Sequence, residues 1–107
     1  MNLFFQAFWA AIFEEWRELK TVHVNSDDEY FALLHEFFKN HEDQFVREYA
    51  STSIYEDLAD SFMHFVLDPK PTGNSIIEKK ILFFYDFPEL VTLRQQMIQN
   101  VCSYTQE

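Results

Sequence analysis

The stretch EYASTSIYEDLADSFMHFVL, residues 48–67, decides how this chain folds, because it contains a complete helix together with its start signal. Ser53 and Glu56 form an S-x-x-E capping box, in which each side chain satisfies a backbone N–H of the other residue. Apolar residues then recur at helical spacing and predict a helix from about 54 to 67. They are Ile54, Leu58, Phe62, Phe65 and Val66.

A second row of side chains on the same predicted helix is polar. Glu56, Asp60 and His64 follow one another at intervals of four residues, so they share one face away from the main apolar stripe. The simplest interpretation is a solvent-exposed face, with Glu56 used in the capping box. Met63 and Leu67 project close to this row, however, which indicates that something covers the face in part.

Four other helices are expected along the chain. Their approximate ranges are 3–20, 27–40, 75–87 and 88 onwards. Ser26 with Glu29 and Ser75 with Glu78 form two further capping boxes, and Pro88 is a favoured first-turn residue. The fourth helix is apolar nearly all round, so it should be central. Residues 41–53 show no clear helical periodicity.

Length and composition agree with this helical pattern. The chain has 107 residues, which is the size of one domain, and 48% of them are apolar. It contains thirteen Phe, five Tyr and two Trp but only one Gly, and runs of β-branched residues are few. We therefore predict a single all-α domain over residues 1–107, with about five helices in a compact irregular bundle.

The net charge of −10 disfavours nucleic acid as a partner, because the phosphate backbone would be repelled. The sequence contains no cluster of basic residues, so it does not suggest binding to a membrane surface. The opening MNLFFQAFWAAIF, residues 1–13, is too short for a transmembrane segment and lacks the basic start of a signal peptide. A domain that begins inside an aromatic helix suggests that the chain was cut from a longer one.

Two features that could suggest a metal site do not predict one. In HEFFKNH, His35 and His41 are six residues apart, whereas two zinc-binding histidines on one helix face are four apart. Cys102 is the only cysteine, so it can form neither an internal disulfide nor a cysteine zinc cluster.

The stretch FVREYASTSIYEDLADSFMHFVL, residues 45–67, resembles the downstream half of bacterial zinc metallopeptidases of the gluzincin type. This family is distantly similar to the catalytic domain of anthrax lethal factor. FFQAFWAAIFEEW resembles the helix after the family's upstream metal-binding region, and KILFFYDFPELVTLRQQ resembles its C-terminal pair of helices. The resemblance covers most of the chain, is weakest over 21–44, and implies the helical C-terminal subdomain of a zincin.

The resemblance implies a role for each of three residues. Glu56 matches the glutamate that completes a His₂Glu zinc site. Asp60 matches the acid that hydrogen-bonds a zinc-bound histidine and so fixes its orientation. Tyr49 matches the tyrosine whose hydroxyl stabilises the oxyanion of peptide hydrolysis. His64 matches no role.

The chain departs from the family at two points. The family often has Glu at the position of Asp60, and no H-E-x-x-H motif occurs in these residues. That motif supplies two zinc ligands and the general base. The resemblance therefore implies a C-terminal part that needs an upstream H-E-x-x-H segment to bind Zn²⁺ tightly and to cleave a peptide or protein substrate. A secreted or cell-surface location is the expectation for the family.

Two alternatives remain open. The chain is either an acidic helical module for protein–protein contact or a pseudo-peptidase that keeps the fold without the metal. The fragment interpretation predicts an exposed apolar patch and self-association, involving the first helix and the side of Met63 and Leu67. The module interpretation predicts a stable monomer with a covered core.

Overall fold

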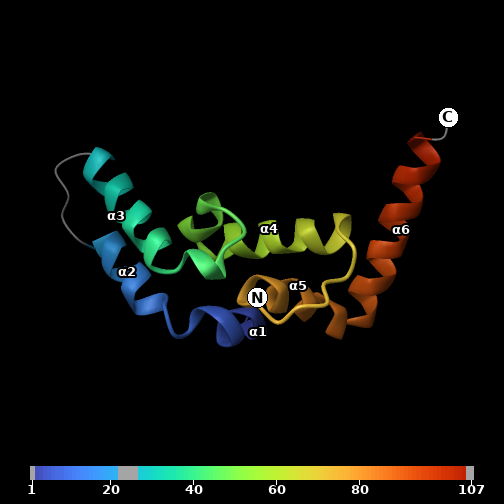
Figure 1. The fold of residues 1–107 in the computed structure, drawn as a ribbon, viewed down its shortest axis with the longest axis horizontal. Helices are drawn as coiled ribbons and strands as arrows, with labels where there is room; N and C mark the ends of the chain where they lie inside the picture. The colour runs from blue at the N-terminus through green and yellow to red at the C-terminus, as the bar shows by residue number, and fades with distance from the viewer. Residues whose placement is uncertain (1, 22–26, 106–107) are drawn as a thin grey trace.

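In the computed structural model, residues 2–21 and 27–105 are described, with side chains for 2–19 and 27–100. Every regular element within these ranges is helical, so the predicted all-α class is confirmed (Figure 1). The elements are α1 (Asn2–Phe4), the π turn η1 (Phe5–Trp9), α2 (Phe13–Thr21), α3 (Asp27–Asn40), the 3-10 turns η2 (Glu42–Gln44) and η3 (Glu48–Thr52), α4 (Ile54–Leu67), α5 (Ile76–Phe83), the 3-10 turn η4 (Phe84–Asp86) and α6 (Pro88–Thr105).

The central helix α4 begins and ends where the sequence predicts. The Oγ of Ser53 accepts the backbone N–H of Glu56 at 3.2 Å, so the serine half of the capping box is present. At the other end, the N–H of Asp68 donates to the carbonyl of His64 at 2.9 Å. α4 contacts η3, α5 and α6, and it lies across the middle of the molecule (Figure 1).

The N-terminal segment departs from the single continuous helix predicted over 3–20. The N–H of Ala10 donates to the carbonyl of Phe5 at 2.9 Å, which is the hydrogen bond of a π turn, and α2 begins only at residue 13. In a regular α-helix Phe4 and Trp9 would lie about 140° apart. The wider turn brings both rings into the core, where neither is exposed. The prediction is wrong because burial of two large rings outweighs regular helix geometry.

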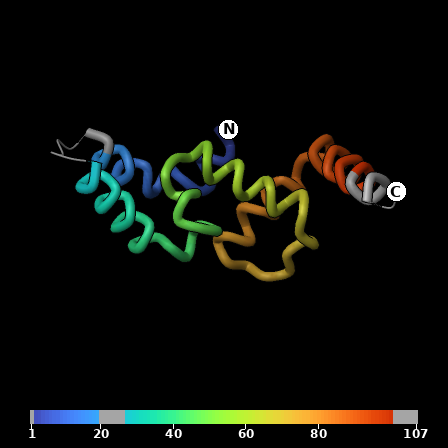
Figure 2. The backbone as a smooth tube through the Cα atoms, turned by 90° about the horizontal axis from the view of Figure 1, so that it is seen from above, coloured from blue at the N-terminus to red at the C-terminus, as the bar shows by residue number. Residues whose placement is uncertain are grey.

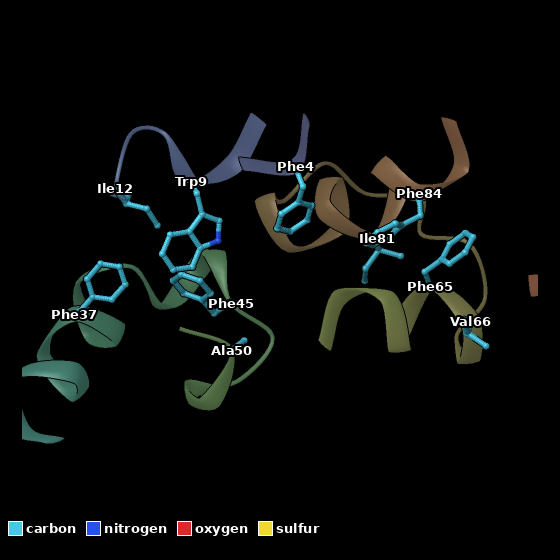
Figure 3. Packing of buried hydrophobic residues seen from close by; sticks show 10 residues of the cluster. All are labelled: Phe4, Trp9, Ile12, Phe37, Phe45, Ala50, Phe65, Val66, Ile81 and Phe84. Carbon is cyan, nitrogen blue, oxygen red and sulfur yellow. The ribbon is translucent and has the colours of Figure 1, made fainter. Parts of the chain in front are cut away.

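The buried aromatic rings form two groups that the N-terminal segment joins (Figure 3). In one group the ring of Trp9 lies 5.8 Å from that of Phe45 and 6.3 Å from that of Phe37. In the other, the ring of Phe84 lies 5.4 Å from that of Phe65. Phe4 and Trp9, from the two ends of the π turn, each enter one group. The core therefore runs along α4 rather than around one point.

The C-terminal helices agree with the predicted starts and differ at one predicted end. Ser75 Oγ accepts the N–H of Glu78 at 3.1 Å, so this capping box is present. α5 ends at Phe83, short of the predicted end at Phe87, and the chain tightens into η4. Phe87 is extended (φ −111°, ψ 103°), as expected for a residue that precedes proline. α6 then begins at Pro88 as predicted.

The molecule is elongated, with extents of 53 × 30 × 22 Å and a radius of gyration of 16.4 Å. A compact domain of this length has a radius of gyration of about 13 Å. The excess arises at the two ends, where α2 with α3 and the far part of α6 extend from the body (Figures 1 and 2). The predicted 26–29 capping box depends on residue 26, outside the described ranges. Among the helices that are described, none has the length and hydropathy of a membrane span.

Candidate functional site

The acid expected to support a zinc ligand is bound to an arginine. Asp60 is buried on α4, and Arg47 precedes η3, which packs along that helix. Arg47 Nε donates to Asp60 Oδ2 at 2.7 Å, and its Nη2 donates to Oδ1 at 2.8 Å. Both oxygens of the carboxylate are therefore used in one two-bond ion pair, which fixes its orientation.

Tyr49 also lies close to this arginine. The guanidinium carbon of Arg47 is 5.2 Å from the centre of the Tyr49 ring, and the tyrosine side chain is about half exposed. The hydrogen bond and charge of Asp60 raise the pKa of Arg47, and the charges of Tyr49 and Glu56 add to this effect. Asp60 and Tyr49 thus both contact Arg47, which the sequence did not indicate, and Glu56 lies one helical turn before Asp60.

These three residues alone do not supply a zinc site, because the resemblance makes only Glu56 a metal ligand. Each oxygen of Asp60 accepts one hydrogen bond from Arg47, which leaves further lone pairs on the carboxylate. Glu56 is partly buried in the first turn of α4, with its N–H on Ser53. Within the described side chains, no group of three or more His, Cys, Asp or Glu residues could hold a metal ion. Zinc bound jointly with an upstream segment stays a prediction.

The histidines on α3, after α3 and on α4 each contact an acid. The pairs are His35 with Glu48, His41 with Glu15 and His64 with Asp68. The first two histidines therefore have separate partners from different parts of the chain. In the third pair, Nδ1 lies 2.7 Å from the carboxylate Oδ2, at the last turn of α4.

A buried ion pair on α4, which the sequence did not indicate, connects three segments. Lys80 Nζ lies 2.8 Å from Asp57 Oδ2, and at most 1% of either side chain is exposed. Trp9 Nε1 donates to the same oxygen at 2.8 Å. The lysine also donates to the carbonyl of Gln44 at 2.5 Å and lies 4.2 Å from the centre of the Phe45 ring. η1, α4 and α5 therefore meet at one carboxylate that solvent does not reach.

Burial and pairing act in opposite directions on this ion pair. Burial raises the pKa of Asp57 and lowers the pKa of Lys80, whereas their mutual attraction opposes both shifts. One signal was present in the sequence: Lys80 interrupts an apolar helix, whereas Asp57 lies beside the polar row of α4 and does not stand out. Their pairing depends on how two helices pack, which spacing does not reveal. Because the carboxylate is closed off from substrates, we assign it a structural role.

An apolar groove lies on the molecule between α4 and the turn from α5 to α6, with a volume of about 470 Å³. None of the side chains that line it is charged. Leu3 and Tyr55 at its edges are 62% and 67% exposed. Its lining residues are Leu3, Phe4, Tyr55, Leu58, Ala59, Phe62, Phe83, Phe84, Phe87 and Leu90. The fragment interpretation places exposed apolar surface on the first helix and on the side of Met63 and Leu67. Leu3 lines the groove, whereas Met63 and Leu67 are exposed on α4 but do not line it.

Comparison of the chain with protein-family models, with curated proteins and with solved structures finds no match. The resemblance to gluzincin metallopeptidases therefore depends on the quoted segments and on Tyr49, Glu56 and Asp60.

Proposed function

We propose that this protein is an acidic helical binding module whose groove holds an apolar face of a basic, amphipathic helix from a partner protein. The observation that carries the proposal is an open groove with an uncharged lining on a chain of net charge −10. Contiguous exposed apolar surface with a polar surround is typical of protein interaction sites. A groove that accepts the apolar face of a helix is a common form of peptide recognition.

The charge of the chain selects the kind of partner. Asp86 and Glu89 are exposed and directly precede or follow groove residues in the sequence. Lys or Arg residues beside the apolar face of a partner would be attracted by these two acids and by the net negative charge, which speeds association and disfavours acidic partners. Small molecules also bind pockets of this size, but such sites need placed polar groups. The Tyr55 hydroxyl is the one polar side-chain group in this lining.

The test uses a designed 18-residue amphipathic helix with Leu and Phe on one face and Lys on the other, labelled for fluorescence anisotropy. Controls are a scrambled peptide of the same composition and a peptide with Glu in place of Lys. We expect the designed helix to bind and both controls to bind at least about tenfold more weakly. Equal binding of the scrambled peptide would mean that charge alone drives association, which contradicts the proposal.

Two matched variants locate the binding surface. Tyr55→Glu places a charge in the groove, whereas Phe31→Glu places the same charge at a residue of similar exposure on α3. We expect the Tyr55 variant to weaken binding of the designed helix by about tenfold or more and the Phe31 variant to leave it unchanged. Far-UV circular dichroism checks that both variants fold. An equal loss in both variants would place binding outside the groove.

A second proposal is that the chain is the C-terminal helical part of a zinc metallopeptidase, inactive alone. The contacts of Tyr49 and Asp60 with one arginine, and the place of Glu56 one helical turn before Asp60, support it, because these are the residues that the resemblance assigns to one site. Zinc titration of the chain alone, followed by calorimetry, should show weak binding. One tightly bound ion that is lost in Glu56→Ala would overturn the need for an upstream segment, and an upstream H-E-x-x-H in the parent reading frame would favour this proposal over the binding module.

A further inference from the structure

The last helix, α6, is attached to the body near its start and extends beyond it (Figure 1). Arg94 provides the attachment: its Nε donates to the carbonyl of Phe65 at 2.6 Å, and its Nη2 donates to the carbonyl of Asp68 at 2.9 Å. α6 has eighteen residues, so it is about 27 Å long, and it contacts η4 and α4. Beyond Arg94, most of the side chains that the structure describes are exposed, at residues 95–97, 99 and 100.

An apolar stripe leaves the groove and continues along this helix. Leu90 lines the groove, and Leu93 and Met97 follow at the i+3 and i+7 positions of the same face. Leu93 is 41% exposed and Met97 is 38% exposed. A stripe of this kind on a helix that projects from the body is the pattern of a helix–helix contact.

The charge pattern identifies the partner. Arg94 is the only charged residue between Val91 and Thr105, and the carbonyls at the end of α4 occupy its guanidinium. The remaining polar residues of this stretch are Thr, Gln, Asn, Ser and Tyr. If two copies of this chain, with its net charge of −10, paired through other surfaces, acidic residues of one copy would face acidic residues of the other. α6 is thus a surface that another copy of the same acidic chain can approach, whereas it lacks the charges that would select a basic partner.

We infer that two copies of this chain pair through α6, with Leu93 and Met97 of one copy against the same residues of the other in a two-fold symmetric contact. This goes beyond the proposed function, because the groove and the stripe bind different partners. A single helix supplies an interface at the small end of the known range, below about 1,200 Å² in total. The pairing is therefore weak, and the repulsion between the two acidic bodies makes it stronger as salt is added.

Sedimentation velocity over about 1 to about 200 μM protein tests the pairing. We expect a monomer–dimer equilibrium whose dimer fraction rises when NaCl is raised from about 0.05 to about 0.5 M. A wild-type chain that stays monomeric at the highest concentration and salt, or that forms open-ended assemblies, would overturn the inference.

Three variants locate the contact. The double variant Leu93→Gln, Met97→Gln removes the stripe without adding charge, and it should raise the dimer dissociation constant by about tenfold or more. Phe31→Glu and Tyr55→Glu should leave it unchanged, because these exposed residues lie outside α6. If Tyr55→Glu abolishes the dimer and the double variant does not, the copies pair through the groove and the inference is wrong. This readout needs no partner peptide, so it is independent of the proposed binding function.

Discussion

Two aspartates on α4, three residues apart, each bind a basic residue in a different environment. Asp57 and its partner Lys80 are both buried, and Trp9 adds a hydrogen bond. Asp60 is buried as well, but its partner Arg47 has 58% of its side chain exposed. The difference shows that the position of the cation decides what an ion pair does. Water can replace an exposed arginine, whereas nothing can replace a lysine inside the core.

The largest expected effect comes from removing the buried cation. Lys80→Met leaves the carboxylate of Asp57 buried without its counter-ion, which should lower the free energy of unfolding by about 3–5 kcal/mol. Lys79→Met is the matched control, since Lys79 is the exposed neighbour on the same helix. Urea unfolding followed by circular dichroism measures both variants. An equal change in the two would show that Lys80 does not stabilise the core through Asp57.

The pH dependence of stability sharpens the same comparison. Because burial raises the pKa of Asp57 above its ordinary value of 3.8, the folded chain binds more protons there than the unfolded chain does. The stabilisation from protonated Asp57 is thus fully present below pH 3.8 and is lost as the pH rises through the folded pKa. The melting temperatures of the wild type and of Asp57→Asn should be measured from about pH 3 to about pH 7. We expect the wild-type value to fall relative to that of the variant as the pH rises. A flat difference would contradict the raised pKa.

The smallest effect is expected at the exposed cation. Arg47→Ala removes both hydrogen bonds to Asp60, but water can reach the acid once the arginine is gone. We expect a loss of stability that is less than half of that in Lys80→Met, yet larger than in Arg17→Ala, whose ion pair with Glu14 is exposed at both ends. Urea unfolding ranks the three variants. A loss in Arg47→Ala equal to that in Lys80→Met would mean that the two sites do not differ in kind.

The sequence predicted the elements whose boundaries depend on local signals. The bounds of α3 and α4 and the start of α6 agree with the prediction, because acidic first turns, caps and a proline set them within a few residues. It did not predict the break after Trp9, since the geometry there depends on rings that contact distant helices. The pairing of Asp57 with Lys80 was missed for the same reason.

The roles of the candidate site residues stay a prediction. Tyr49, Glu56 and Asp60 were named from a resemblance, and two of them, Tyr49 and Asp60, contact Arg47. Arg47 was not named, although it stands within the quoted segment, because a basic residue before a helix has no distinctive spacing. Whether zinc ever joins these residues stays a prediction. The side chains of Cys102 and of Val101, which is four residues after Met97, lie outside the described part of the chain.

The π turn near the N-terminus has a consequence for how the chain tolerates insertions and deletions. Compared with an α-helix, a turn closed from Ala10 to Phe5 contains one extra residue. A deletion within it would do more than shorten a surface helix, because one residue of α-helix corresponds to a rotation of about 100°. Either Phe4 or Trp9 would then point away from its partners. In this segment the number of residues is therefore constrained as well as their identity, because the hydrogen bond from Trp9 to Asp57 depends on where the turn places the indole ring.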